Sequence, residues 1–409
     1  MIFKKASNFT SIFFMFKVLI LYKSLPQYRI SFFDLLRQEL YKNGVILELI
    51  YGDADLRGKN DCVTSEWAIF KPNKYLDIGI TRLTWQPCLK EIKSADLVIV
   101  EQADRLLINY VLILRRIFKN KQFAFWGHGL NRQAKSYSIS NIFKRFYINK
   151  CDWWFAYTEG IKSFLIKNGY PSSRITTVQN AIDTQQMNNE YFSICEEELN
   201  VIRRKYNMQK EETILIYCGA LYKEKRIDFL IDTIDEIVKR TEKVKLVVLG
   251  GGPDENIIKE AALTRPYLIY AGPRFGREKA TFFKLSTLFL LPGSMGLAIL
   301  DSFAFETPII TTKYPFHGPE LEYLVDGQNG IITENTKSCY IDAVEELLKN
   351  KEKMQQITEN CIEEIGRYSN ERMVANFMDG IKKLIGMKKQ KVDIIEKAKN
   401  IKKIQAPFF

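Results

Sequence analysis

The chain has 409 residues, which at about 150 residues per domain predicts two or three globular units. Hydrophobic residues make up 46% of the chain and aromatic residues 13%, a composition that excludes a largely disordered protein. Lysine and arginine number 60 against 48 acidic residues, a net charge of +12. We therefore expect anionic partners, such as phosphorylated substrates, polyanions or an acidic membrane leaflet.

Cysteine and histidine usage restricts the chemistry. The seven cysteines are odd in number and far apart, and they do not fall in a zinc-ligand spacing. The only histidines are His128 and His317, too few for most metal sites or a Ser-His-Asp triad. The pattern predicts a reduced, cytoplasmic protein and argues against a metal hydrolase.

The amino-terminal region resembles a secretory signal in one respect, because Lys4 and Lys5 precede an apolar stretch. Lys17 interrupts that stretch, however, and no small-residue cleavage site follows it. We expect residues 1–15 to be an amino-terminal extension, with Met1 and Met15 as alternative starts, and residue 16 to begin the first strand. No segment reaches the roughly 20 apolar residues of a membrane-spanning helix.

Short apolar runs alternate with longer amphipathic stretches through the first half, the pattern of a parallel sheet covered by helices. The expected strands are residues 16–22, 45–51, 97–101, 122–126, 153–157 and 175–178. The expected helices are residues 28–42, 106–118, 140–149 and 159–167. We interpret the polar span 184–212 as a link to the next domain.

The second half repeats this rhythm. The expected strands are residues 214–218, 245–249, 268–271, 288–291 and 308–311. The expected helices are residues 226–240, 256–264, 277–285, 297–305, 341–349, 353–366 and 370–385. We predict an α/β protein with two tandem Rossmann-like, doubly wound domains at residues 16–190 and 191–385 and a cleft between them. The last helix is expected to pack back on the first domain. Residues 386–409 are expected to form a basic tail.

Three glycine-containing turns follow strands in the second domain. Gly219 begins a turn that leads through Lys225 and Arg226 into a helix, and a turn at a helix start can bind an anion. The alternative is a plain strand-to-helix turn with solvated lysines. Gly250, Gly251 and Gly252 either lie against a flat base or ribose or simply form a tight turn. The third turn leads to Asp301, which either accepts hydrogen bonds from ribose hydroxyls or is an acid favoured near a helix start; its members are Pro292, Gly293, Ser294, Met295, Gly296 and Leu297.

These turns are followed by Gly318-Pro319-Glu320 and by the loop 326–330. The order and spacing resemble the donor-binding half of the family-4 retaining glycosyltransferases (glycosyl transferases group 1) of the GT-B fold. The resemblance covers roughly residues 16–385 and is strongest over residues 214–333.

The resemblance implies roles for individual residues. Lys225 corresponds to the lysine that grips the nucleotide diphosphate, and Ala220 stands where an arginine is usual, so Arg226 or Arg274 is expected to compensate. Asp301 corresponds to the ribose-binding acid of the Glu-x7-Glu motif, whose first acid has no counterpart here. Glu320 resembles another acid of the cleft. The expected donor-binding set is Gly219, Lys225, Arg226, Gly251, Arg274, Gly293, Ser294, Met295, Gly296, Leu297 and Asp301.

The first half offers three further candidates. His128 follows a strand at Trp126-Gly127, where the family places a histidine near the anomeric centre; an ordinary hydrogen-bonded histidine is the alternative. Arg29 follows the first strand and would meet a phosphate or the acceptor. Glu101 ends the third strand and is either an acceptor-side acid or a surface carboxylate. His317 has a weaker claim than His128.

Two segments suggest contact with a membrane. Residues 143–148 mix aromatic and basic side chains, although a helix of this composition more often packs against a core. Beyond Met387 the tail carries seven lysines against two acids, and it forms either a basic amphipathic helix on an anionic leaflet or a frayed end.

Together these features predict a metal-independent glycosyltransferase that needs no cofactor, since the nucleotide sugar is a substrate. The expected acceptor is a glycan or a lipid-linked glycan of bacterial cell-surface polysaccharide biosynthesis, and the expected location is cytoplasmic, peripheral on the inner face of the plasma membrane. One alternative is a nucleotide-sugar 2-epimerase of the same architecture, for which two histidines are few. The other is a basic nucleic-acid-binding protein, which we do not expect because it would need basic residues along a groove with stacking aromatics.

Overall fold

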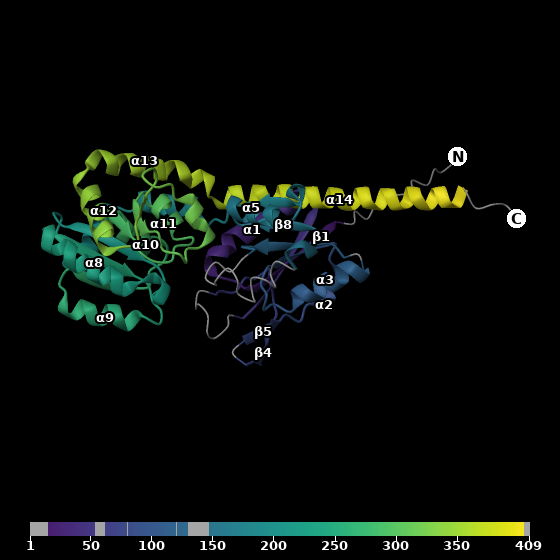
Figure 1. The fold of residues 1–409 in the computed structure, drawn as a ribbon, viewed down its shortest axis with the longest axis horizontal. Helices are drawn as coiled ribbons and strands as arrows, with labels where there is room; N and C mark the ends of the chain where they lie inside the picture. The colour runs from purple at the N-terminus through teal and green to yellow at the C-terminus, as the bar shows by residue number, and fades with distance from the viewer. Residues whose placement is uncertain (1–14, 54–61, 80, 120, 130–146, 405–409) are drawn as a thin grey trace, which may run out of the picture. The chain divides into compact units, whose positions relative to one another are not determined.

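The computed structural model describes residues 15–53, 62–79, 81–119, 121–129 and 147–404. The chain divides into two compact units, Met1–Phe125 and Trp126–Phe409. Each unit is described separately below (Figure 1). The expected helix at residues 140–149 lies mostly outside the described residues.

The first unit is built on parallel strands. Its core strand β1 (Phe16–Ser24) pairs in parallel with β2 (Val45–Gly52) on one side and with β6 (Leu97–Glu101) on the other. Val18 to Leu21 in β1 are 0% exposed, which is typical of a strand covered by helices on both faces. The unit also contains β3 (Ile69–Phe70), an antiparallel pair β4 (Lys74–Ile78) and β5 (Thr81–Trp85), and the helices α1 (Ile30–Lys42), α2 (Leu89–Ser94) and α3 (Ile108–Lys119).

The unit boundary falls inside β7 (Phe123–Gly127). The strand order of the sheet to which β7 belongs is β3-β2-β1-β6-β7-β8-β9. In the second unit, β8 (Trp153–Ala156) pairs in parallel with β9 (Ile175–Thr177), and α5 (Glu159–Lys167) connects the two strands. Because the order changes direction between β1 and β6, the loops that follow these two strands lie at a topological switch point.

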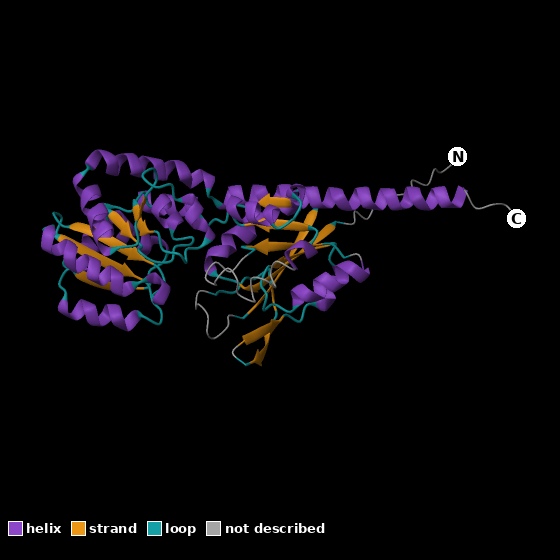
Figure 2. Ribbon diagram, in the orientation of Figure 1, coloured by secondary structure: helices purple, strands orange, loops and turns teal. Residues whose placement is uncertain are grey.

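The second unit also holds a six-stranded sheet with the order β12-β11-β10-β13-β14-β15 (Figure 2). Every pairing in this sheet is parallel, and its switch point lies between β10 and β13. Its strands are β10 (Thr213–Cys218), β11 (Val244–Leu249), β12 (Leu268–Gly272), β13 (Leu288–Leu290), β14 (Ile309–Thr312) and β15 (Ile331–Thr333). Its helices are α8 (Ile227–Arg240), α9 (Glu255–Thr264), α10 (Gly276–Leu285), α11 (Ile299–Ala304), α12 (Lys337–Lys349) and α13 (Lys351–Arg367).

The predicted α/β class with two Rossmann-like sheets is confirmed. The elements β3, β4, β5, β15 and α2 were not predicted from the sequence, and they are two to six residues long. Elements this short carry little hydrophobic periodicity of their own.

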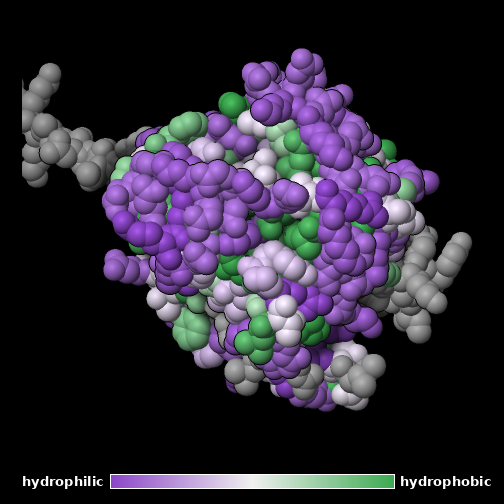
Figure 3. All heavy atoms as spheres, turned by 90° about the vertical axis from the view of Figure 1, so that its left-hand side faces the viewer, coloured by the Kyte–Doolittle hydropathy of each residue, from purple (hydrophilic) through white to green (hydrophobic). Residues whose placement is uncertain are grey.

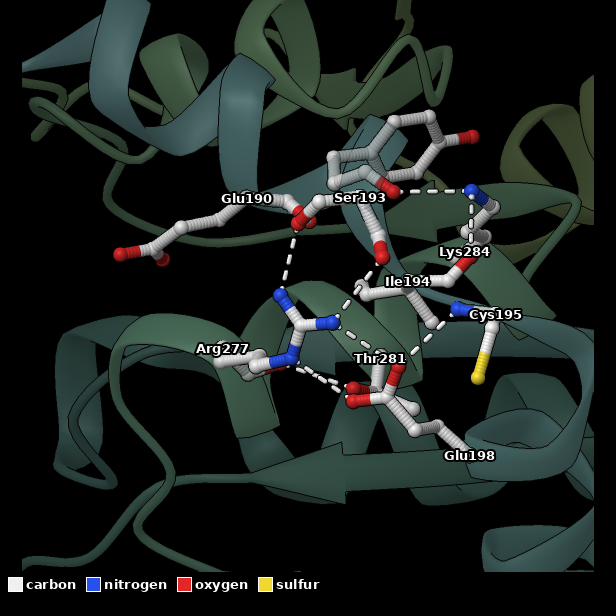
Figure 4. Close-up of polar contacts among 9 residues, drawn as sticks. Glu190, Ser193, Ile194, Cys195, Glu198, Arg277, Thr281 and Lys284 are labelled. Atoms are coloured by element: carbon white, nitrogen blue, oxygen red, sulfur yellow. Dashed lines mark hydrogen bonds and ion pairs between the residues drawn. The ribbon is translucent and has the colours of Figure 1, made fainter.

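Residues 184–212 are not the simple link that the sequence suggested. They form α6 (Thr184–Ser193) and α7 (Glu196–Lys205). The corner between these helices is hydrogen-bonded to α10, as Figure 4 shows. Arg277 donates to both carboxylate oxygens of Glu198 at 2.7 and 2.8 Å and also to Ser193. Lys284 donates to the carbonyls of Tyr191 and Ile194. The polar composition reflects helices whose charged side chains bind a neighbouring helix.

The last helix, α14 (Asn370–Ile404), continues 19 residues past the predicted end at residue 385. Its first half packs on β8 and β9, where Phe377 stacks on Phe155 with ring centroids 4.6 Å apart and Gly380 lies against Phe155 and Thr176. Among the described residues, no helix combines the length and the apolar composition needed to cross a membrane. On the side of the molecule seen in Figure 3, hydrophobic side chains are scattered among hydrophilic ones.

Candidate functional site

The candidate site lies at the switch point of the six-stranded sheet, where the turn after β10 meets the turn after β13. A Cβ placed on Gly293 would lie 2.4 Å from the carbonyl oxygen of Glu224 and 2.6 Å from the carbonyl carbon of Lys225. Only glycine permits this approach, because a side chain would collide with backbone. The Ser294 N–H donates to the Glu224 carbonyl at 2.7 Å and holds the turns together.

Lys225 places its ammonium group between the two turns. Its Nζ donates to the Ser294 carbonyl at 2.5 Å, and the residue is 7% exposed. The same Nζ would lie 3.8 Å from a Cβ on Gly219, so the cation also reaches the turn after β10. The structure thus brings Gly219, Lys225, Gly293 and Ser294 together.

The glycine triplet packs against the turn that follows β10. A Cβ on Gly250 would lie 1.9 Å from the Gly219 carbonyl oxygen, and one on Gly252 would lie 2.3 Å from that of Leu221. The Gly251 carbonyl accepts from the Leu221 N–H at 2.9 Å. These contacts give the triplet a packing role, because it lets two backbone segments lie in direct contact.

Arg226 forms hydrogen bonds to the loops around this site. Its backbone is left-handed (φ 59°), and its Nη1 donates to the Pro292 carbonyl, to Thr312 Oγ1 and to Asn335 Oδ1 at 3.2, 3.2 and 2.6 Å. The guanidinium group also lies over the Phe229 ring, 4.0 Å from its centroid. In this structure the charge of Arg226 is therefore engaged with groups of the protein itself.

Arg274 lies elsewhere. It follows β12, which is the edge strand two positions from β10. Its guanidinium group donates to Tyr206 at 3.4 Å and lies 3.8 Å from Glu278. The strand order places Arg274 away from the switch point.

Asp301 is paired with a lysine that sequence reasoning missed. Lys279 Nζ, from the first turn of α10, lies 2.7 Å from Asp301 Oδ1, and both side chains are mostly buried. Burial is the largest single effect and lowers the pKa of Lys279, but the charge and hydrogen bond of Asp301, together with the charges of Cys218 and Glu190, outweigh it, and the pKa is raised. Burial, with Asp301 contributing, raises the pKa of the nearby Cys218 thiol to about 12, so this thiol stays protonated. Lys279 therefore adds a second cation near the end of β10, close to where Ala220 leaves one missing.

His317 fixes the Met295 turn. Its Nδ1 accepts from the Met295 N–H at 3.0 Å, so its Nε2 carries the proton and donates to the Thr312 carbonyl at 2.8 Å. Gly318 N–H donates to the Met295 carbonyl at 2.6 Å, so both sides of the turn are held. Burial, assisted by the charges of Lys225 and Arg226, lowers the pKa of His317 below its ordinary 6.5.

The internal bonds of Ser294 and Met295 bear on how the turn would meet a ligand. The N–H groups of both residues donate within the protein, to Glu224 and to His317. Gly296 and Leu297 come next and lead into α11. The side chain of Met295 is 0% exposed and belongs to the core.

Glu320 links this turn to strand ends of the first sheet. Its Oε1 accepts from Asn180 Nδ2 at 2.6 Å, and its Oε2 lies 3.6 Å from the position of a Cβ on Gly296. Asn180 follows β9, and its N–H donates to the carbonyl of Tyr157, which follows β8. The Glu320 carboxylate thus stands beside the Gly296 turn and is oriented by a buried amide.

His128 follows β7 and is exposed. Its ring meets the Tyr157 ring edge to face, with centroids 4.5 Å apart. Since Tyr157, Asn180 and Glu320 are successive neighbours, a continuous set of contacts leads from His128 to the Gly296 turn. His128 and Glu320 are therefore connected through Tyr157 and Asn180.

The two candidates of the first unit lie at the switch point of their own sheet. Arg29 follows β1 and is 0% exposed, with its guanidinium group 5.0 Å from the centroid of the Tyr28 ring. Glu101 ends β6, and its Oε2 accepts from the Lys23 N–H at 3.3 Å. Burial raises the pKa of Glu101, although the Lys23 N–H and the charges of Lys23 and Arg29 oppose that shift. Arg29 and Glu101 thus lie within electrostatic reach of one another.

Comparisons with known proteins agree with this geometry. Residues 200–364 match the model of the family described as glycosyl transferases group 1, and this segment contains the Gly219 and Gly293 turns, Lys225, Asp301 and Glu320. Over these residues the chain is similar to the group 1 glycosyl transferases.

Curated proteins that are similar to part of this chain include a glycolipid synthase and a polysaccharide glycosyltransferase. The alpha-monoglucosyldiacylglycerol synthase of Streptococcus pneumoniae is 31% identical over 129 residues, which are 30% of this chain and 29% of that protein. The capsular polysaccharide biosynthesis glycosyltransferase CapM of Staphylococcus aureus is 24% identical over 214 residues, 50% of this chain and 54% of that protein. The matches thus span about half or less of the curated relatives.

Solved structures share the fold over a longer range. A glycosyltransferase from Rickettsia africae superposes with a TM-score of 0.69 at 14% identity, covering 91% of this chain and 99% of that one. Anabaena HepE in complex with UDP-glucose superposes with a TM-score of 0.62 at 14% identity, covering 90% and 99%. The expected GT-B fold is confirmed.

Lys279 and Asn180 were not among the predicted site residues, and His317 was ranked below His128. Lys279 lies inside a helix and has no motif around it, so only the fold shows that it meets Asp301. His317 had a usable signal, since it directly precedes Gly318-Pro319-Glu320.

Proposed function

We propose that the protein is a retaining glycosyltransferase that moves a sugar from a nucleotide-sugar donor to a glycan or lipid-linked acceptor of bacterial cell-surface biosynthesis. The observation that carries this proposal is the cationic switch point, where Lys225 lies between two touching turns and Lys279 pairs with Asp301. A diphosphate needs cations and backbone N–H groups at such a point, and a ribose needs a carboxylate beside it.

The donor would lie across the carboxyl ends of β10 and β13. Lys225 would bind the diphosphate and stabilise the charge that develops on it as the glycosidic bond breaks, without a metal ion. The N–H groups of Gly296 and Leu297 would contribute further donors, while Asp301 would accept from the ribose hydroxyls. We propose a uridine diphosphate sugar, because structural neighbours include a complex with UDP-glucose.

The sugar would lie between the Gly296 turn and His128. Glu320 would accept hydrogen bonds from sugar hydroxyls, and its contact with Asn180 fixes its direction. His128 would meet the sugar near the bond that breaks, while Arg29 and Glu101 would serve the acceptor side. We place the reaction in the cytoplasm, where nucleotide sugars are made, at the inner face of the plasma membrane.

Transfer is better supported than 2-epimerisation. An epimerase of this architecture needs several acid and base groups for elimination and re-addition, and His317 has both ring nitrogens bonded to backbone groups. His128 is then the one histidine with a ring at the candidate sugar site.

A panel of nucleotide sugars, screened by protection against thermal unfolding, tests the donor class. A donor present at 100 times its dissociation constant adds about 2.7 kcal/mol to stability. The Lys225→Ala variant should lose roughly 1.5–3 kcal/mol of that binding free energy. Lys223→Ala, at an exposed lysine two residues earlier, is the matched control and should bind normally. Unchanged donor binding by Lys225→Ala would show that the diphosphate does not bind at Lys225.

A further inference from the structure

The pair of Lys279 and Asp301 lies beside the turn that holds Lys225. The charges of these three residues all act on the thiol of Cys218, which is the last residue of β10. The side chains of Lys279 and Asp301 are 17% and 11% exposed. The pair is therefore mostly enclosed by the protein at the carboxyl end of β10, and part of each side chain is still accessible.

The contact within the pair leaves hydrogen-bonding capacity on both partners. Lys279 Nζ donates to Asp301 Oδ1 at 2.7 Å. Within the part of the chain that the structure describes, no other hydrogen bond reaches Lys279 Nζ, and none reaches Asp301 Oδ2. An ammonium group has three N–H donors, whereas a carboxylate oxygen only accepts. The pair thus presents a donor directly beside an acceptor.

This arrangement selects the chemistry of a ligand. Lys279 keeps its proton at neutral pH because its pKa is raised, so it must meet an oxygen that accepts. Asp301 Oδ2 needs a donor and repels an anion. A phosphate offers acceptors and negative charge, which satisfies only the lysine. Two neighbouring hydroxyl groups satisfy both, because each hydroxyl can donate and accept.

We infer that Lys279 and Asp301 together bind the cis-diol of a ribonucleotide, with one hydroxyl donating to Asp301 Oδ2 and the other accepting from Lys279 Nζ. Lys279 is then a residue that selects ribose, while the diphosphate is bound by Lys225. The inference deepens the proposed function and rests on it, since that proposal brings the nucleotide to this switch point. It differs from binding by Asp301 alone, in which both hydroxyls would donate to one carboxylate.

Calorimetric titration of the full chain with UDP, 2′-deoxy-UDP and 3′-deoxy-UDP tests the inference. Each deoxy analogue should bind the wild type roughly tenfold more weakly than UDP does, because a hydrogen bond to a charged group is lost. In Lys279→Met one of the two analogues should bind as well as UDP, because the hydroxyl that it lacks has no partner in this variant. The other analogue should keep its deficit, because Asp301 is still present.

A second background makes the test independent of stability. Lys279→Met leaves a buried carboxylate unpaired, whereas the same change made in Asp301→Asn does not. In that background, adding Lys279→Met should again abolish the deficit of one analogue. Lys284→Met is the matched control, because Lys284 belongs to the same helix and donates to the carbonyls of Tyr191 and Ile194. This control should lower stability and leave both deficits as they are in the wild type.

Inorganic pyrophosphate separates ribose from diphosphate, because it lacks the diol. Its affinity should be nearly the same in Lys279→Met and the wild type, and a clear fall would assign Lys279 to the diphosphate and overturn the inference. Deficits of both analogues that survive Lys279→Met would also overturn it, since a lysine that only holds the carboxylate gives that result. In both cases UDP still binds, and the proposed function stands. A folded wild type that binds no UDP would refute the proposed function and this inference together.

Discussion

At the scale of single residues, the candidate site depends on buried polar groups that position one another. His317 is the clearest example, because its two nitrogens bond to the backbone of Met295 and Thr312. Its unprotonated Nδ1 is an acceptor, and a proton there would remove the bond to the Met295 N–H. The Met295 turn therefore depends on a neutral imidazole.

The affinity for UDP should fall as the pH drops through the folded-state pKa of His317, which lies below the ordinary 6.5. The pKa of His317 is lower in the folded protein than in the unfolded chain, so the unfolded chain binds the proton more readily. The folding stability that neutral His317 contributes is fully present above the pKa of the unfolded chain. It is lost as the pH falls through the lower pKa of the folded protein. The groups facing the ring include Lys225 and Arg226, which keep their charge over this range, and Tyr314, whose pKa burial raises.

Calorimetric titration with UDP between pH 5 and pH 8 measures this effect. In His317→Asn the affinity should be low and nearly independent of pH, whereas His128→Asn should keep the wild-type pH dependence. A pH dependence that disappears in His128→Asn instead would move the titrating group to His128.

The pair of Lys279 and Asp301 leads to a prediction about stability. Lys279→Met leaves a buried carboxylate without its cation, and loss of one partner of a buried pair costs about 3–5 kcal/mol. Adding Asp301→Asn removes the unpaired charge, so the double variant should regain part of that loss. Urea unfolding of the two single variants and the double variant measures the coupling. Additive effects would show that the two side chains do not depend on each other.

At the scale of elements, one short segment joins parts of the second unit that are far apart in sequence. The 3-10 helix η5 (Pro319–Tyr323) follows His317 and contacts residues after β8 and β9. Glu322 accepts from Thr158 Oγ1 at 2.9 Å and from the Gly160 N–H at 2.8 Å, so it caps the start of α5. Tyr323 stacks on Tyr368, with ring centroids 3.8 Å apart.

Glu322→Gln should lower the free energy of unfolding by about 1 kcal/mol, because a carboxylate at a helix start is worth about that amount. Glu159→Gln is a useful control, since Glu159 is in the first turn of the same helix but forms an ion pair with the half-buried Lys162 of that helix. Chemical denaturation of both variants gives the comparison. Equal small losses would indicate that the contact from η5 adds nothing to ordinary surface electrostatics.

At the scale of the whole molecule, charge is concentrated in particular segments. The tail beyond Met387 carries a net +5 of the chain's +12, and its backbone is helical to Ile404. The first half of α14 packs on β8 and β9, and the lysines of the tail follow it in the sequence.

Deletion of residues 388–409 should therefore leave stability and UDP binding unchanged and should weaken binding to anionic vesicles, most strongly at low salt. Thermal unfolding, UDP titration and vesicle flotation on the same protein test these three statements. A fall in the melting temperature would show that the tail is part of the folded core. A loss of DNA binding without a loss of vesicle binding would favour a nucleic acid as the partner of the tail.

The sequence by itself determined the fold class and the turns at the strand ends, because buried parallel strands read as apolar runs and a glycine turn followed by a helix has a fixed local form. It placed Gly219, Lys225, Gly293 and Asp301 after the correct strands. It could not pair Asp301 with Lys279, or His317 with Met295, because those contacts join residues 22 positions apart across different elements. It also could not show that Arg226 is engaged with Pro292, Thr312 and Asn335. Only the tertiary structure decides which side chains share a buried space, since that depends on how distant segments pack.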